Sequence, residues 1–197
     1  MRDRQNLRRQ LATLAAAQSG YFTAKQALGV GYSYQAQKYH ADRGNWQRVD
    51  RGVFRLPEWP VGQHDDLVRW SLWSRGKAVV SHDTALAVYD VGDFNPSLVH
   101  LTVPLNFRPK ASAIRLHRAE LPAEDIRPYD GFRITTPLRS LLDIAVESYE
   151  VEQLSTAIGD ALRAGLVTRR QLLARADGFG PRAALAIERA IRQLEEL

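Results

Sequence analysis

A segment of 36 residues, from position 21 to position 56, joins two helix-like runs, a glycine turn and a basic ribbon in one compact order. The first run covers residues 23–28, the turn G-V-G covers 29–31, and the second run covers 33–43. The ribbon W-Q-R-V-D-R-G-V-F-R-L follows at residues 46–56. Helix, turn, helix and basic hairpin is the layout of a winged helix-turn-helix, in which a helix fits the DNA major groove and nearby cations neutralise phosphates. The segment therefore predicts a small DNA-binding domain.

The positive charge of the chain is concentrated in its N-terminal part. The formal net charge is +5, but residues 1–60 carry ten Lys and Arg against four Asp and Glu, which gives +6, and the remainder carries −1. A basic module joined to a nearly neutral one indicates that one part holds a polyanion and the other has a different task. A solvated cationic surface without a ligand is the alternative, and the helix-turn-helix pattern favours the first interpretation.

Composition narrows the class of protein further. The chain has no cysteine, which excludes disulfides and thiolate metal sites and is compatible with a reducing cytoplasm. Residues 1–10 are polar and charged, unlike the apolar core of a signal peptide. No apolar run approaches the ~18–20 residues that cross a bilayer. We therefore expect a cytoplasmic protein that does not associate with a membrane.

Local signals place the helices of the N-terminal domain. Apolar residues at three- and four-residue spacing predict a helix over residues 3–18, which Gly20 ends. Thr23 and Gln26 have the spacing of a capping box, in which each side chain binds a free backbone N–H at the helix start. Ser33 is expected to cap the second helix in the same way.

The second helix is the expected recognition helix, and its spacing predicts which face points inward. Four residues at i, i+3, i+4 and i+7 share the face expected to pack on the other helices: Ala36, Tyr39, His40 and Arg43. This assigns the outward, DNA-facing positions to Tyr34, Gln35, Gln37 and Lys38.

The ribbon at residues 46–56 predicts a β-hairpin with its turn at Asp50-Arg51-Gly52. Its three arginines could be edge-strand solubilisers, but three at one hairpin beside a recognition helix favour phosphate contact. The predicted DNA-binding residues are thus Lys25, Ser33, Tyr34, Gln35, Gln37, Lys38, Arg48, Arg51 and Arg55.

Two prolines in L-P-E-W-P break helix and strand, so the domain boundary is expected near residues 57–62. We predict a winged helix-turn-helix over residues 1–58 and a second domain over 62–197. The second domain is expected to be mixed α/β and then helical. Its pattern predicts helices at 63–75 and 83–89 and strands at 78–81, 98–103, 114–118 and 132–135. A helix capped by Thr136, with Pro137 in its first turn, and three further helices follow, one of which begins with a Thr168–Gln171 capping box. The fold class is α+β.

The last helix carries a narrow apolar seam made of Ala184, Ile187, Ile191 and Leu194. The seam could dock on a partner protein or on a second copy of this chain. Packing onto Leu154 and Ile158 inside the domain is the favoured alternative.

Few residues of the sequence form a recognisable catalytic or metal-binding pattern. Ser81-His82-Asp83 contains the letters of a catalytic triad, but adjacent side chains are expected to diverge. His100 and His117 lie on alternating strands and could both be ligands of one metal, but no third histidine or clustered carboxylate accompanies them. Asp143, Glu147 and Glu150 are expected to form a solvated face. No phosphate-binding glycine loop is present. We expect no catalytic residue, cofactor or metal site, and no enzymatic activity.

Residues 21–56, closing with R-V-D-R-G-V-F-R-L, resemble the N-terminal winged-helix domain of AbiEi-type antitoxins of type IV toxin–antitoxin systems. The segment S-H-D-T-A-L-A-V-Y-D-V-G-D at 81–93, followed by V-H-L-T-V-P at 99–104, is similar to the second domain of that family. T-T-P-L-R-S-L-L-D-I-A at 135–145 resembles its later helix.

The resemblance implies a repressor that binds inverted repeats of double-stranded DNA in its own promoter, as a possible homodimer. It also implies that the second domain counteracts a nucleotidyltransferase-type toxin, with direct contact left open. The recognition helix is less basic than is usual in the family, and glutamines such as Gln35 can pair with adenine. The alternative is a stand-alone winged-helix regulator whose C-terminal domain mediates protein interaction or dimerisation.

Overall fold

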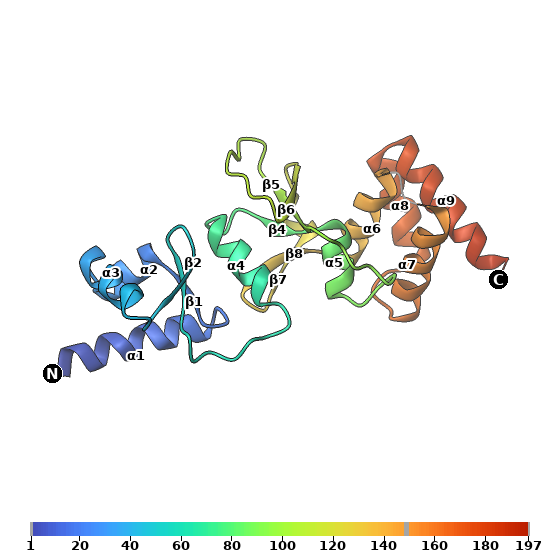
Figure 1. Cartoon of the computed structure of the whole chain (residues 1–197). Helices are drawn as coiled ribbons and strands as arrows, with labels where there is room; N and C mark the ends of the chain where they lie inside the picture. Colours follow the sequence, from blue (N-terminus) through green and yellow to red (C-terminus); the bar gives the residue numbers. More distant parts are fainter. Residues whose placement is uncertain (1, 148–149, 197) are drawn as a thin grey trace. The chain divides into compact units, whose positions relative to one another are not determined.

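The computed structural model describes residues 2–147 and 150–196, and it divides into two compact units. Unit 1 runs from the N-terminus to Ala78 and includes Pro128–Arg133, whereas unit 2 comprises Val79–Arg127 and the chain from Ile134 onward. Both units mix helices and strands (Figure 1), so the predicted α+β class is confirmed. Unit 1 extends past residue 58 and includes a helix that the sequence assigned to the second domain.

Unit 1 gathers its helices around a three-stranded sheet. The strand order is β1-β3-β2, and both pairings are antiparallel. Figure 1 shows α2 and α3 beside α1 with the sheet next to them. The elements in chain order are α1 Arg2–Ala16, β1 Tyr21–Thr23, α2 Ala24–Val30, α3 Tyr34–Asp42, β2 Gln47–Asp50, β3 Val53–Arg55 and α4 Asp65–Trp73.

The turn between α2 and α3 is defined by its caps. The Thr23 hydroxyl accepts a hydrogen bond from the Gln26 N–H at 3.1 Å, and the Gln26 side chain accepts from the Thr23 N–H at 2.7 Å. The Ser33 hydroxyl accepts from the Ala36 N–H, so both predicted caps are confirmed. Between them Gly31 has φ +118°, a backbone conformation that glycine adopts without steric cost. These contacts fix where α3 begins.

The interior of unit 1 contains a cluster of aromatic rings. Phe22 of β1 is fully buried and contacts the rings of Trp46 and Phe54, at centroid distances of 4.9 Å and 5.7 Å. Leu11 and Ala15 of α1 are buried in the same cluster. The Ala24 N–H also donates to the Gly52 carbonyl oxygen in the hairpin turn, which ties the start of α2 to the hairpin.

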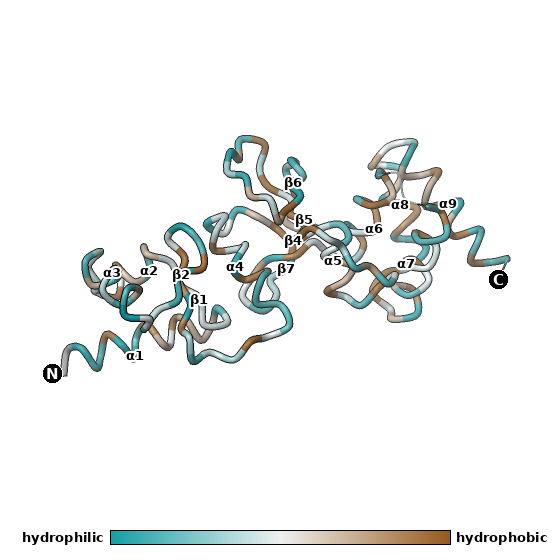
Figure 2. Tube along the Cα trace, in the orientation of Figure 1, coloured by the Kyte–Doolittle hydropathy of each residue, from teal (hydrophilic) through white to brown (hydrophobic). Residues whose placement is uncertain are grey.

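Unit 2 contains a five-stranded sheet in the order β6-β5-β4-β8-β7, with the tip of the β7–β8 hairpin in unit 1. Its strands are β4 Val79–Val80, β5 Val99–Val103, β6 Ile114–Arg118, β7 Ile126–Tyr129 and β8 Phe132–Thr135. The β5–β6 and β4–β8 pairs are parallel and the β4–β5 pair is antiparallel. Figure 2 shows the apolar colour of β4 at the centre of this sheet. Strand β7 was not predicted, because its Pro128 removes a backbone donor, which is tolerated at the edge of a sheet.

The helices of unit 2 are α5 His82–Val88, α6 Pro137–Val146, α7 Val151–Arg163, α8 Arg169–Phe179 and α9 Pro181–Glu195, with a short 3₁₀ turn at Ala123–Asp125. Thr136 caps α6 with Pro137 in its first turn, and Thr168 and Gln171 form the predicted capping box of α8. These helices share an aliphatic core.

The apolar seam of α9 is part of this core. Ile187 and Ile191 are buried in one cluster with Leu154 and Ile158 of α7, while Leu194 packs against its margin. The predicted packing of the seam inside the domain is confirmed, so its residues are not available to a docking partner. Among the residues that the structure describes, no helix is both long and apolar enough to cross a bilayer.

Candidate nucleic-acid interface

Helix α3 is anchored by a buried glutamine. The side chain of Gln37 is only 3% exposed, and its Nε2 donates to the carbonyl oxygens of Ala24 and Tyr32, both at 3.0 Å. An amide nitrogen has two hydrogens, so one side chain satisfies two carbonyls. The prediction that Gln37 faces DNA is therefore wrong: it is an internal brace that holds α3 against the start of α2.

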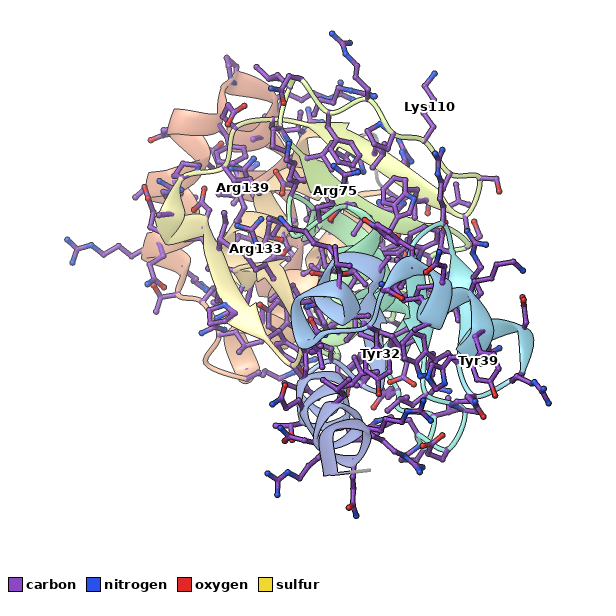
Figure 3. The ribbon with its side chains drawn as sticks, turned by 90° about the vertical axis from the view of Figure 1, so that its left-hand side faces the viewer. Tyr32, Tyr39, Arg75, Lys110, Arg133 and Arg139 are labelled. Carbon is purple, nitrogen blue, oxygen red and sulfur yellow. The ribbon has the colours of Figure 1, made fainter. Side chains whose placement is uncertain are left out.

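The outward face of α3 is rotated relative to the prediction. Tyr34 and Gln35 are exposed as expected, but Tyr39 is also exposed, at 55% against 67% for Tyr34. Arg43 is exposed as well, with its guanidinium carbon 5.5 Å from the centre of the Tyr39 ring. In Figure 3 Tyr39 lies at the outer margin of the ribbon and Tyr32 lies further in. Sequence reasoning missed Tyr39 and Arg43, because it placed both on the inward face.

Lys38 shares the outward face but is paired. Its Nζ lies 2.6 Å from Asp42 Oδ2, one helical turn along, in an exposed ion pair. Such pairs contribute little to stability, and a phosphate can compete for the lysine. Ser33 is exposed and caps the helix, and Lys25 is exposed on α2. Each of these positions remains on the surface as predicted.

The hairpin β2–β3 keeps two of its three predicted cations on the surface. Arg48 and Arg51 are exposed, with Arg51 in the turn that Gly52 completes at φ +74°. The structure corrects the third position, because Arg55 is only 8% exposed. Its Nη2 donates to Asp65 Oδ2 at 2.8 Å and to the Pro60 carbonyl oxygen at 3.0 Å. Arg55 therefore holds the hairpin to the segment leading into α4 and is not a phosphate contact.

The resulting surface combines donors and aromatic rings with cations. Hydroxyl, amide and ring groups on α3 suit base edges and sugars, while guanidinium and ammonium groups suit phosphates. Its exposed members are Lys25, Ser33, Tyr34, Gln35, Lys38, Tyr39, Arg43, Arg48 and Arg51.

Unit 2 contains a second candidate site, built from histidines. The parallel register pairs His100 with Arg115 and Thr102 with His117, which places His100 and His117 on one face of the sheet. His82, the first residue of α5, stacks its ring on that of His117, with centroids 3.5 Å apart. Three of the five histidines of the chain thus meet in the interior of unit 2.

Carboxylates surround these rings. Glu147, just after α6, has its Oε1 at 3.4 Å from His117 Nδ1 and 3.9 Å from His82 Nε2. Asp143 is buried and binds Arg139 at 2.8 Å. The prediction that these acids form a solvated face is wrong for Asp143 and Glu147, whereas Glu150 is exposed. The third histidine and the carboxylate that sequence reasoning did not find are therefore His82 and Glu147.

Burial sets the charge of this cluster. Burial, with repulsion from the other histidines, lowers the pKa of His82 to about 2 and that of His117 to about 4. Burial also lowers the pKa of His100, and it raises the pKa of Asp143 to about 6. The histidine rings are accordingly neutral near pH 7, with a nitrogen lone pair on each.

The letters Ser81-His82-Asp83 do not make a catalytic triad. The two neighbouring side chains do meet, since His82 Nδ1 lies 2.9 Å from Ser81 Oγ, contrary to the expected divergence. Asp83, however, approaches His100, with Oδ1 at 3.9 Å from Nδ1. Ser81 is fully buried and accepts a hydrogen bond from Thr102, so its oxygen is not placed to attack a substrate.

The N-terminal unit thus presents an exposed polar helix and a hairpin with two exposed arginines. Residues 9–57 match the family described as "Transcriptional regulator, AbiEi antitoxin". The resemblance of the N-terminal segment to AbiEi antitoxins is confirmed over these residues.

Solved structures extend the likeness in fold. The crystal structure of the RV2827C protein from Mycobacterium tuberculosis is similar to this chain with a TM-score of 0.61. The alignment covers 94% of this chain and 79% of that one at 14% sequence identity, so it shows a common fold alone. A comparison with curated proteins found no match.

Proposed function

We propose that this protein is the antitoxin of a toxin–antitoxin system, which binds its own promoter as a repressor through a winged helix-turn-helix of residues 1–58. The order α1-β1-α2-α3-β2-β3, with β3 between β1 and β2, supports a winged helix. The family match over residues 9–57 supports a regulatory role.

The observation that carries the proposal is the division of α3 into an anchored face and a polar exposed face. Gln37 holds the helix from inside, and Tyr34, Gln35 and Tyr39 are exposed on the other side. Helix α3 would lie in the major groove, while Arg48 and Arg51 of the hairpin would contact the backbone or the minor groove. Base contacts would then come from α3, and phosphate contacts from the hairpin.

Binding is tested with a fragment of the protein's own promoter and a scrambled duplex of equal length, in a salt series followed by fluorescence anisotropy. Removing one phosphate contact lowers the slope of log affinity against log salt by ~0.9. We expect this reduction on both duplexes for Arg51→Ala and Arg48→Ala. Gln35→Ala should instead weaken the preference for the promoter. Arg170→Ala, an exposed arginine of α8, is the matched control and should leave the slope unchanged.

Equal slopes for wild type, Arg48→Ala and Arg51→Ala would refute this assignment of the hairpin. Absence of promoter binding at low ionic strength would refute the repressor function itself.

The antitoxic action is assigned to the second domain, residues 62–197, against a nucleotidyltransferase-type toxin encoded beside this protein. The double variant Arg48→Ala, Arg51→Ala separates the two activities in the full chain. It should lose repression and still rescue cells that express the adjacent toxin. If the wild-type chain represses but rescues no cells, the alternative holds, a stand-alone winged-helix regulator. Its supposed interaction surface would then have to lie elsewhere than the α9 seam, since Ile187 and Ile191 are buried.

No catalytic step is part of this proposal. Supercoiled DNA incubated with the protein and Mg²⁺ should remain intact, and its cleavage would contradict a purely regulatory role.

A further inference from the structure

The histidine cluster of unit 2 lies outside the candidate nucleic-acid interface and outside the aliphatic cluster of the unit 2 helices. We propose that His82, His117 and Glu147 form a binding site for a divalent transition-metal ion of the zinc type. One nitrogen of each ring and one carboxylate oxygen all lie within 4.8 Å of one another.

The distances fit a shared ion better than direct hydrogen bonds. Glu147 Oε1 is 3.4 Å from His117 Nδ1 and 3.9 Å from His82 Nε2, whereas N–H···O hydrogen bonds have lengths of about 2.7–3.2 Å. Two ligands of a tetrahedral Zn²⁺, each at about 2.0–2.1 Å from the ion, lie about 3.3 Å apart. An inward movement of the three side chains, together with rotation of the stacked rings, would therefore complete the ligand set.

The ligand types select the metal. Imidazole nitrogen with carboxylate oxygen suits Zn²⁺ and its neighbours among the transition metals, whereas Mg²⁺ and Ca²⁺ prefer sites made of oxygen alone.

Two ring nitrogens of the histidine cluster are buried without hydrogen-bond partners. Among the described residues, His117 Nε2 and His100 Nδ1 are buried and have no hydrogen-bond partner, although such atoms are usually satisfied. The His100 ring lies 5.2 Å from that of His117 and 6.1 Å from that of His82. A third neutral imidazole therefore lies beside the proposed ion.

Surrounding side chains can orient the ligands, as they do in known metal sites. Ser81 Oγ lies 2.9 Å from His82 Nδ1 and can accept a hydrogen bond from its N–H, which leaves the lone pair on Nε2. Arg115 Nη2 lies 3.5 Å from Glu147 Oε2, so Oε1 is the carboxylate oxygen turned toward the rings. Because imidazole binds a metal in its ring plane, the stacked rings of His82 and His117 must turn relative to each other on binding.

The ion would connect three parts of unit 2 that are distant in sequence: the start of α5, strand β6 and the residue that follows α6. Three protein ligands leave a fourth position for water or for His100.

The test is calorimetric titration of Zn²⁺ into the full-length, untagged protein after treatment with a chelator. We expect one Zn²⁺ per chain and no heat of binding with Mg²⁺. Changes to residues around metal ligands already weaken binding by about 10–100-fold, so His117→Gln and Glu147→Gln should weaken it by more than about 100-fold. His64→Gln is the matched control, since His64 belongs to unit 1, and it should bind as wild type does.

NMR of the histidine side chains tests the site in the wild-type protein, where no variant has to fold. In the wild-type protein, Zn²⁺ should shift the imidazole nitrogen NMR signals of His82 and His117 and leave those of His40 and His64 in place. Glu147→Gln nearly preserves side-chain shape, and its circular dichroism should match that of wild type. Equal Zn²⁺ affinity in wild type and both ligand variants would overturn the proposal. So would shifts confined to His40 and His64, or the absence of binding at micromolar Zn²⁺.

Discussion

The interiors of the two units are built from different chemistry. Unit 1 packs aromatic rings, with Phe22, Trp46 and Phe54 in mutual contact. Unit 2 packs aliphatic side chains among its helices and histidines with carboxylates on one face of its sheet. Large rings bury much area per residue, so a small unit can reach a stable core with few side chains.

The same contrast separates the candidate sites. Unit 1 has its polar groups on the outside of α3 and the hairpin, where a large ligand such as DNA can reach them. Unit 2 buries its histidines, where only a small ligand can reach them. An exposed polar surface can change with little effect on stability, whereas a buried polar cluster cannot. Substitutions in the two units should therefore differ in their effects on stability and on binding.

The aromatic core should dominate the stability of unit 1. Phe22→Ala is expected to lower the free energy of unfolding by about 4 kcal/mol, since Phe to Ala changes in cores lose burial and leave a cavity. The fluorescence of the tryptophans in urea measures this loss, because all four belong to unit 1: Trp46, Trp59, Trp70 and Trp73.

The matched control for this change is Leu28→Ala, an exposed position of α2, which should change the free energy by less than about 0.5 kcal/mol. If both variants unfold at the same urea concentration, the aromatic cluster does not hold unit 1 together.

Two of the three hairpin arginines should behave in opposite ways. Arg55→Ala removes one partner of a buried ion pair and leaves Asp65 without its cation, which is expected to cost about 3 kcal/mol. Arg51→Ala should leave stability within about 0.5 kcal/mol of wild type and lower DNA affinity. Urea unfolding and anisotropy on the same samples separate these effects. A stable Arg55→Ala variant with weakened DNA binding would return Arg55 to the interface.

The two glutamines of α3 provide a smaller test of the same kind. Gln37→Ala leaves the carbonyl oxygens of Ala24 and Tyr32 without their donor, at an expected cost of about 2 kcal/mol. Gln35→Ala should have no measurable effect on unfolding, because its side chain is exposed. The outcome that contradicts the structure is a change of sequence preference in Gln37→Ala with unaltered stability.

The errors at α3 show what sequence reasoning can and cannot reach. The caps at Thr23, Ser33 and Thr168 were predicted, because each depends on residues three positions apart. Which side of α3 points inward was not predicted correctly, because it depends on hydrogen bonds to carbonyl oxygens of α2 and of the turn before α3. From the sequence alone, the polar side chain of Gln37 is expected to be exposed, because the two carbonyl oxygens to which it donates are known only from the structure.

The histidine cluster was hidden for a related reason. His82, His117 and Glu147 are far apart in the sequence, and they are brought together by a parallel strand pair and the end of α6. Sequence reasoning did name His100 and His117 as possible ligands of one metal, but it read His82 only as part of the letters of a catalytic triad. Alternation correctly placed residues 114–118 in a strand, and parallel pairing of that strand with β5 would have been enough to bring His100 and His117 together.

The smallest expected effect concerns His40, which gives unit 1 a half-buried histidine of its own. Its ring stacks on Trp46 at 4.8 Å, and burial lowers its pKa below 6.5. The Asn45 amide nitrogen, 3.2 Å from His40 Nδ1, can donate to the neutral ring. Because the unfolded chain takes up this proton more readily, the stability from His40 is complete above pH 6.5 and is lost as pH falls toward the folded pKa.

The measurement is the free energy of unfolding, followed by tryptophan fluorescence, of wild type and His40→Phe between pH 7.5 and 5.5. Wild type should lose more stability than the variant over this range, since phenylalanine keeps the ring stacking without a titratable nitrogen. Tryptophan signals report unit 1, so the difference between the two proteins isolates His40 from the histidines of unit 2. Parallel pH dependences in the two proteins would mean that burial of His40 has no energetic consequence, and that only unit 2 couples its histidines to its fold.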